Sequence, residues 1–369
     1  MNGPMKYMYG NASFPVDDFL LSQINSAAEK LHRILSGLDL PKVGISEYNQ
    51  RYLGSKLSNP VGNLQIYTNL LSLSLSGGKT PLDKFTFVDY GGGSGVMSLL
   101  AKQLGIGRVV YCDIYSGSCK DVKVLSEKTG IPVDDIVCGD IEDLIAYVRK
   151  GSIYIDSITS FDVIEHIYDI DSYLRKLRLL SDYNFRVVLA SGANIRNPLI
   201  FANWTRHQLI MEYREKERKW GTKETESTRS YLAIRKDIIK KFNSSLRPET
   251  VDRLAKRTRG LRKDDVEKSV REFVETGKIS YRPDRTNTCD PITGNYQEHL
   301  MESERLQRIL AEEGFNVKIM SGYWKTRNRY IFTLIMNIMN LGIRHLGKNA
   351  LFFSPYFVVF ADYNRPDHP

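Results

Sequence analysis

Short apolar runs alternate with helix-length stretches through the middle of the chain, and this alternation constrains the fold more than any other feature. The runs of strand length begin at Phe85, Arg108, Ile136, Ser157 and Phe185. Between them lie helical candidates at 96–104, 116–129 and 170–180. Strands that alternate with helices at this spacing form parallel sheets with helices on both faces. We therefore predict an α/β fold with a doubly wound, Rossmann-like sheet.

The segments that flank this α/β region differ from it in pattern and charge. Apolar residues recur at helical spacing before residue 79, which predicts a helical N-terminal segment over 1–79. Residues 205–285 hold 23 Lys and Arg against 14 Asp and Glu, an excess equal to the net charge of +9 of the whole chain. We predict a core over 80–204, a basic helical insertion over 205–285, and the C-terminal part of the core sheet over 286–369. Helices are expected around 207–220, 230–242 and 263–276 in the insertion and over 296–313 after it.

Composition excludes several classes of protein. With 42% hydrophobic and 26% charged residues, the 369-residue chain is neither fibrous nor wholly disordered. Its four cysteines form no C-x-x-C pair and have no metal-ligand spacing with the six histidines, so we expect no metal site and no disulfide framework. Reduced thiols and an N-terminus unlike a signal peptide predict a cytoplasmic protein. The apolar stretch 330–346 is interrupted by polar residues and is too short for a membrane span.

The clearest local motif is the sequence from Phe87 to Gly95, which reads Phe-Val-Asp-Tyr-Gly-Gly-Gly-Ser-Gly. It follows an apolar strand and opens a helix, so the backbone can approach a ligand closely and helix-start N–H groups can meet negative charge. A nucleotide-like cofactor is expected. The dinucleotide fingerprint G-x-G-x-x-G, read from Gly91, would place glycine at position 96, but valine stands there. Hydride-transfer cofactors are therefore disfavoured.

The spacing Asp89-x-Gly91-x-Gly93-x-Gly95 resembles motif I of the class I S-adenosylmethionine-dependent methyltransferases. The resemblance covers about 80–202 and, weakly, 296–362, and it implies a seven-stranded sheet that binds S-adenosylmethionine. Phe161-Asp162-Val163-Ile-Glu165-His166 is similar to the segment after the fourth strand in the branch of ubiquinone-biosynthesis O-methyltransferases and other small-molecule methyltransferases. A tight turn without a ligand is the alternative interpretation of the glycines.

The resemblance also assigns cofactor contacts along the chain. It implies that Asp113 binds both ribose hydroxyls, with Ile114 beside it, and that Asp140 and Ile141 contact the adenine. The full set of implied cofactor residues is Asp89, Gly91, Gly92, Gly93, Gly95, Asp113, Ile114, Asp140, Ile141, Asp162 and Val163. Asp113 as an exposed loop carboxylate and Asp140 as a helix N-cap are the structural alternatives.

Methyl transfer to an alcohol needs an in-line nucleophile and often a base. His166 is the leading candidate because its ordinary pKa of about 6.5 lets the neutral ring accept a proton near pH 7. Glu165 is a second candidate. A purely structural His166, or catalysis by proximity without a dedicated base, remains open.

The sequence leaves the methyl acceptor open. The segment after the fourth strand lacks the [Asp/Asn]-Pro-Pro motif of nucleobase amino-methyltransferases, and no cysteine follows proline. The basic insertion could clamp RNA, or it could form a lid over a small phosphate-bearing or lipid-linked acceptor. We favour the lid and O-methylation, with substrate candidates Arg51, Tyr52, Tyr231 and Arg235.

Two further questions stay open at this point. The stretch 325–341 is basic and then strongly apolar, which is typical of a peripheral membrane contact, with core or dimer packing as the alternative. The oligomeric state is unknown. An RNA methyltransferase and a catalytically silent cofactor-binding scaffold are the other functions considered.

Overall fold

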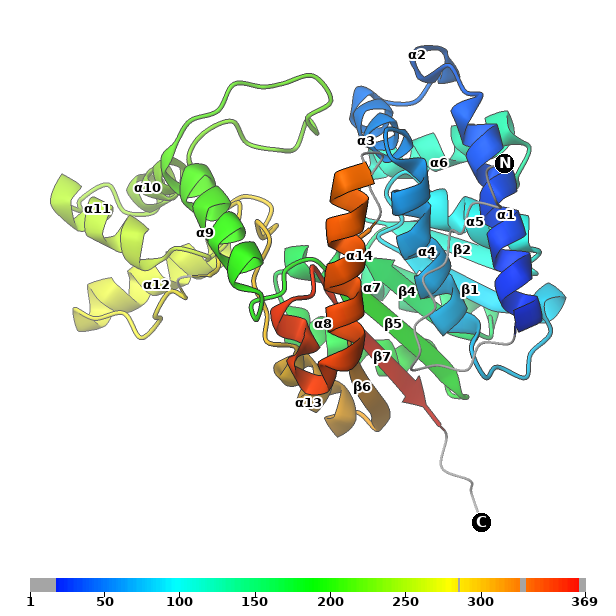
Figure 1. The fold of residues 1–369 in the computed structure, drawn as a ribbon. Coiled ribbons are helices and arrows are strands. Elements are labelled where there is room, and N and C mark those ends of the chain that lie inside the picture. Colours follow the sequence, from blue (N-terminus) through cyan, green and yellow to red (C-terminus); the bar gives the residue numbers. More distant parts are fainter. Residues whose placement is uncertain (1–17, 285, 326–329, 365–369) are drawn as a thin grey trace.

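A computed structural model describes residues 18–284, 286–325 and 330–364. Its centre is one seven-stranded sheet in the order β3-β2-β1-β4-β5-β7-β6 (Figure 1). The first five strands are parallel, and β7 runs antiparallel to β5 and β6. The strands are β1 (Thr86–Tyr90), β2 (Arg108–Asp113), β3 (Asp135–Cys138), β4 (Ser157–Phe161), β5 (Phe185–Ser191), β6 (Phe315–Ser321) and β7 (Phe357–Tyr363). The predicted α/β fold class is confirmed.

Helices cover both faces of the sheet because the strands are apolar on both faces, and β1 is buried along its whole length. The N-terminal helices and α5 pack on one face. They are α1 (Asp18–Ser36), α2 (Leu40–Val43), α3 (Glu47–Leu57), α4 (Pro60–Leu75), the short η1 (Leu82–Lys84), α5 (Val96–Leu104) and α6 (Ser116–Thr129). The opposite face packs against α7 (Ile141–Gly151), α8 (Ile170–Leu177), η3 (Arg178–Leu180) and α13 (Ser303–Glu312).

The basic insertion forms a helical cap with a hydrophobic cluster of its own beside the sheet (Figure 1). Its helices are α9 (Pro198–Tyr213), α10 (Tyr231–Phe242), α11 (Pro248–Arg257) and α12 (Lys263–Thr276). The predicted boundaries at 204 and 285 stay predictions, although the described helices α10 to α12 pack mainly against one another.

Two helix predictions differ from the structure, and one observed helix was not predicted. A helix was expected over 207–220, but α9 begins at Pro198, where Asn197 caps the first turn by accepting from Leu199 N, and it ends at Tyr213. Pro248 starts α11, which periodicity did not indicate. The expected helix 296–313 is shortened to α13, because residues 296–301 form backbone bridges to the core instead.

The connection from β6 to β7 contains α14 (Tyr330–His345) and the short η4 (Gly347–Phe352). Ser321 at the end of β6 pairs with Phe357 at the start of β7, and Phe357 pairs with Ser191 at the end of β5. This connection therefore leaves from and returns to the carboxyl edge of the parallel strands. Among the described helices, none combines the length and hydropathy that a membrane crossing requires.

Candidate active site

The glycine loop between β1 and α5 makes a close contact with the segment that follows β4. Gly91 has a φ of +70°, a left-handed conformation that favours glycine. A Cβ built on Gly91 would lie 2.3 Å from Val163 Cγ2. Any larger residue at position 91 would therefore push Val163 and its neighbours away from the carboxyl edge. The structure thus brings together two of the residues that the sequence assigned to cofactor binding.

Asp89 holds this loop in place through hydrogen bonds to the first turn of α5. It is buried at the end of β1 and accepts hydrogen bonds from the Ser98 backbone N (3.0 Å) and the Ser98 hydroxyl (2.7 Å). Burial raises the pKa of Asp89 to about 6, and the hydrogen bonds from Ser98 oppose that rise. The carboxylate joins the end of β1 to the first turn of α5, which fixes the glycine loop between them.

Asp113 lies at the end of β2 and is hydrogen-bonded to the glycine loop. Its Oδ2 accepts from Gly93 N (2.9 Å) and its Oδ1 from Tyr115 N (2.8 Å). The Tyr111 hydroxyl donates to Gly93 O (2.7 Å), so Gly93 is held from both sides. The next side chain, Ile114, is 76% exposed and therefore available to contact a ligand bound at Asp113. This arrangement suits a ribose on Asp113 and an apolar ring beside Ile114.

The expected adenine contacts after β3, Asp140 and Ile141, both have structural roles in the protein. Asp140 caps α7, with its Oδ1 accepting from Glu142 N (2.8 Å) and Asp143 N (3.4 Å). Ile141 is only 6% exposed and belongs to a core cluster. The packing of Ile141 on adenine stays a prediction, and the structure gives its side chain a place among the core residues.

Three acidic side chains gather around His166 after β4. Glu165 is fully buried, and neither of its carboxylate oxygens meets a donor of normal hydrogen-bond geometry in the described part of the chain. Burial raises the pKa of Glu165 well above its usual range, and the charge of Asp162 raises it further. The third carboxyl, Glu298, comes from the segment before α13, and its pKa is raised to about 8 by burial and by Asp162.

The backbone at this cluster is held in an uncommon conformation. Asp162 (φ +54°) and Glu298 (φ +52°) are two of the three non-glycine residues with left-handed φ in the described ranges. Such residues are rare and concentrate at functional sites. Asp162 Oδ1 accepts from Gly192 N (2.8 Å), and the Gln208 side chain donates to the carbonyl of Glu298 (2.8 Å). The cap helix α9 therefore positions Glu298.

His166 has a defined tautomer. Its Nδ1 lies 2.8 Å from the carbonyl oxygen of Tyr296, which can only accept, so Nδ1 carries the proton and Nε2 has a free lone pair. Burial lowers the pKa of His166 below its ordinary value. At neutral pH the ring is therefore neutral, with Nε2 available to accept a proton or to bind a metal.

This cluster could also hold a cation. One ligand atom each from Glu165, His166 and Glu298 lies within 4.8 Å of the others. Carboxylate and imidazole ligands suit several divalent metals. The spacing of histidines and cysteines in the sequence gave no indication of this set, because two of its three members are glutamates. One of them, Glu298, also lies in a stretch expected to be helical.

Lys56 was not predicted as a site residue. Its ammonium group donates to the Tyr67 hydroxyl and lies 4.6 Å from the centre of the Tyr52 ring. Burial lowers the pKa of Lys56 to about 8, while Asp89 and Asp162 raise it. A Cβ on Gly93 would lie 4.0 Å from the Tyr52 ring, which places Tyr52 at the glycine loop. The i, i+4 spacing of Tyr52 and Lys56 could have indicated this residue from the sequence, because it places both side chains on the same face of a helix.

A loop of the cap reaches over this region toward α3 (Figure 1). Lys223 lies 4.7 Å from the Tyr48 ring and 4.9 Å from the Tyr115 ring, and the Tyr115 hydroxyl donates to Glu224 (2.6 Å). A Cβ on Gly221 would lie 2.9 Å from Arg51 Cβ, so Arg51 packs against the same loop. The loop between α9 and α10 therefore covers the side of the site next to Asp113.

The two substrate candidates in the insertion, Tyr231 and Arg235, are buried among the helices of the cap. Tyr231 is 2% exposed within the hydrophobic cluster of the cap. Arg235 is fully buried, pairs with Glu212 and donates to Ala255 O (2.9 Å). Both side chains therefore help to hold the helices of the cap together, and their substrate role stays a prediction.

Residues 88–180 match the family model described as "Methyltransferase domain". This match spans the glycine loop, Asp113 and the segment after β4. The chain carries a class I S-adenosylmethionine-dependent methyltransferase domain. The protein is an S-adenosylmethionine-dependent methyltransferase, as its sheet order and its glycine loop also indicate.

Solved structures similar to this methyltransferase share little sequence with it. One from Listeria monocytogenes, assigned as an S-adenosylmethionine-dependent methyltransferase, is 12% identical, with 81% of this chain and 98% of that chain covered and a TM-score of 0.39. One from Archaeoglobus fulgidus is 15% identical, with 75% and 86% covered and a TM-score of 0.33. The plantazolicin methyltransferase, solved with SAH, is 13% identical, with 94% and 100% covered and a TM-score of 0.39. No curated protein matches the sequence.

The position of Asp113 leads to a binding prediction. Asp113→Asn is expected to weaken S-adenosylmethionine binding roughly 10- to 100-fold, because it removes the charge from hydrogen bonds to the ribose hydroxyls. Isothermal titration calorimetry measures this dissociation constant directly.

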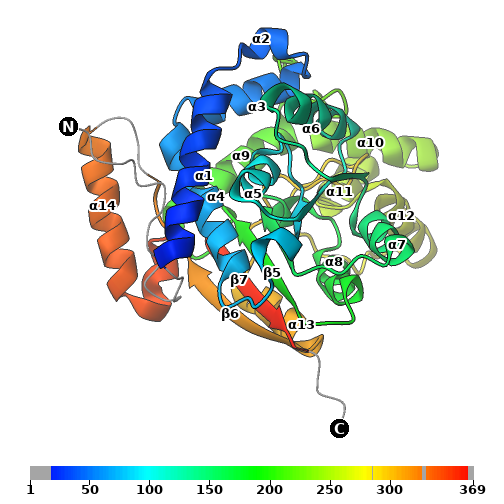
Figure 2. The same cartoon turned by 90° about the vertical axis from the view of Figure 1, so that its right-hand side faces the viewer.

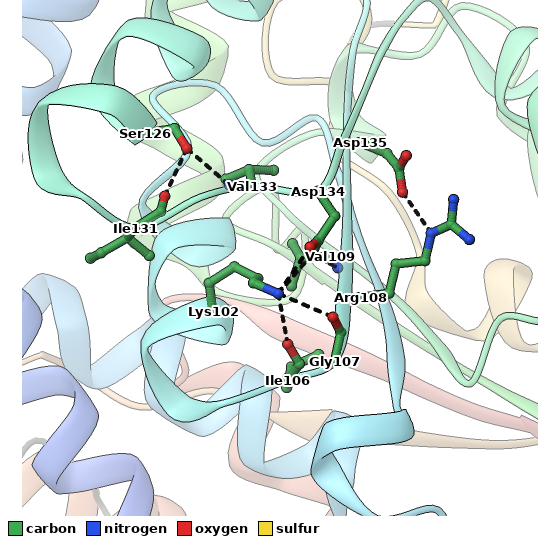
Figure 3. Close-up of polar contacts among 10 residues, drawn as sticks. All are labelled: Lys102, Ile106, Gly107, Arg108, Val109, Ser126, Ile131, Val133, Asp134 and Asp135. Carbon is green, nitrogen blue, oxygen red and sulfur yellow. Dashed lines mark hydrogen bonds and ion pairs between the residues drawn. The ribbon is translucent and has the colours of Figure 1, made fainter.

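Asp134→Asn is the matched control, because Asp134 lies at the opposite, amino-terminal end of β2 (Figure 3). Its Oδ2 accepts from Val109 N (2.7 Å) and its Oδ1 from Lys102 (3.1 Å), so it too bonds backbone and carries charge. This variant should bind the cofactor normally. Unchanged affinity in Asp113→Asn would contradict the assignment of the ribose site.

Proposed function

We propose that the methyltransferase methylates a hydroxyl oxygen of a small or lipid-linked acceptor, with neutral His166 accepting the hydroxyl proton. The observation that supports this most is the hydrogen bond between His166 Nδ1 and the Tyr296 carbonyl, which leaves the Nε2 lone pair free. An alcohol is a poor nucleophile while protonated, so its methylation benefits from a positioned base. The resemblance to small-molecule O-methyltransferases after the fourth strand agrees with this choice.

The bound cofactor supplies an electrophilic methyl group on a sulfonium sulfur. The glycine loop and Asp113 would hold this cofactor, and His166 Nε2 would accept the proton that the acceptor hydroxyl loses when its oxygen is methylated. In this proposal the glycine loop and Val163 orient the methyl group of the cofactor toward the acceptor, and this positioning contributes to the rate.

The buried cluster limits which end of the acceptor reacts. Burial raises the pKa of Asp162, Glu165 and Glu298 around His166, because negative charge is costly there, and an anionic group of the acceptor at the reacting atom would be disfavoured for the same reason. A phosphate-bearing acceptor must therefore hold its phosphate away from the cluster. The basic composition of the cap suits such a phosphate, although several of its lysines and arginines pair within the cap, among them Lys236 and Lys256 with Asp252.

His166→Gln should lower turnover by about 10²- to 10⁴-fold while leaving S-adenosylmethionine binding intact, because glutamine cannot accept the proton. In the wild type, turnover should be constant above about pH 6.5 and fall at lower pH, since burial lowers the pKa of His166 and protonation then removes its lone pair. A pH–rate profile under saturating cofactor measures both effects.

His207→Gln is the control for this prediction. His207 lies on α9 with its ring against Trp204, and burial lowers its pKa as well. The control should keep both turnover and the acid limb. Loss of wild-type turnover with a chelator, restored by Mg²⁺ or Mn²⁺, would contradict proton transfer to His166 and assign its lone pair to a metal.

The acceptor class is tested with methyl-labelled S-adenosylmethionine and a cell extract separated into small-molecule, lipid, RNA and protein fractions. We expect label in the small-molecule or lipid fraction, and none with the His166→Gln variant. Label in RNA would overturn the proposal and make the basic cap a nucleic-acid clamp. Cofactor binding without label in any fraction would instead favour a silent scaffold.

A further inference from the structure

Helix α14 contacts the rest of the protein through a face that carries a buried polar side chain. The Asn340 side chain accepts from Trp324 N (2.7 Å) and donates to Trp324 O (2.8 Å), and Asn340 is 3% exposed. Ile343, three positions on, is 6% exposed. These two residues lie on one face of the helix, and that face is turned inward. A polar side chain thus occupies the inner face of a strongly apolar helix.

The outer face of α14 is apolar. Leu334, Ile338 and Leu341 lie on one side of the helix at i, i+4 and i+7, and they are 51%, 63% and 56% exposed. Ile335 on the same helix is 44% exposed, and Phe352 and Phe353 just after it are 52% and 43% exposed. Figure 2 shows α14 at the outer edge of the molecule. A surface helix of a globular protein ordinarily turns such residues inward, and a contiguous exposed patch marks an interaction surface.

The charge of the chain segment that carries this patch indicates what covers it. Between Glu313 and Asp362 the sequence contains six Lys and Arg residues and no Asp or Glu. Arg344, in the last turn of α14, is exposed among the described residues. Two copies joined through this helix would bring two basic segments together, and neither segment contains a carboxylate to pair with the cations of the other. An anionic surface complements the segment, whereas a second copy does not.

The place of α14 in the fold agrees with a lipid surface. The helix belongs to the connection at the carboxyl edge, where Asp113 and His166 also lie. Near its start, the Tyr323 hydroxyl donates to Gln65 O (2.8 Å) and Lys325 donates to Asn63 (2.7 Å), which ties the segment to α4. Residues 326–329 of the contact predicted over 325–341 lie outside the described residues.

We propose that α14 docks the methyltransferase on an anionic lipid bilayer, with Leu334, Ile338 and Leu341 inserted at the boundary of headgroups and acyl chains. An apolar stripe combined with basic residues is the chemistry of interfacial helices. Docking would hold the carboxyl edge close to the membrane. The delivery of a lipid-linked acceptor to His166 rests on the proposed function, whereas docking itself does not.

Vesicle cosedimentation tests docking without any measurement of catalysis. The full chain is mixed with phosphatidylcholine vesicles that contain, or lack, phosphatidylglycerol. We expect binding to the anionic vesicles that weakens as salt rises. The double variant Ile338→Asp/Leu341→Asp should bind at least tenfold more weakly, because each side chain would otherwise be buried among lipids.

Leu199→Asp/Leu209→Asp is the matched control, since these α9 leucines are 68% and 43% exposed outside the patch. It should bind vesicles like the wild type, and both variants should retain cofactor affinity as a sign of correct folding. Absence of wild-type binding to anionic vesicles, or equal binding by the α14 variant, would overturn the proposal. A dimer in sedimentation velocity that dissociates in the α14 variant would also overturn it and assign the face to a second copy.

Discussion

The close contact between the glycine loop and the segment after β4 is the constraint on which the rest of the site depends. Because Gly91 has no Cβ, Val163 can lie against the loop, and the ends of β1 and β4 come together at one edge. Asp113 then holds Gly93 from the side of β2, and Asp89 ties the loop to α5. The parallel sheet brings these strand ends to the same edge, where ligands of open α/β sheets bind.

Electrostatics decides what this edge can do. Three carboxyl groups in a buried cluster cannot all stay ionised without compensation, and their raised pKa values express that conflict. The left-handed backbone at Asp162 and Glu298 indicates that the surrounding structure maintains the arrangement at a cost. The cap contributes directly, since Gln208 on α9 holds the carbonyl of Glu298. The insertion is therefore a structural partner of the reacting site as well as its cover.

Sequence patterns predicted the sheet and the glycine loop well, because strand hydrophobicity, glycine placement and helix periodicity are local signals. The helices at 96–104 and 116–129 have the predicted bounds. The cluster around His166 was only half predicted, since Glu298 joins it from a stretch more than 130 residues away that forms backbone bridges instead of the expected helix. The burial of the substrate candidate Arg235 was not predicted, because a basic composition does not reveal that Arg235 pairs with a buried Glu212.

The central claim is that the carboxyl edge orients the cofactor so that its methyl group faces His166. A crystal structure of the full chain with S-adenosylhomocysteine and a hydroxylated acceptor mimic tests this most directly. We predict that the ribose hydroxyls bind Asp113, and that the sulfur faces a mimic oxygen within hydrogen-bond distance of His166 Nε2. A ribose bound away from Asp113, or a sulfur that faces away from the carboxylate cluster, would contradict this account.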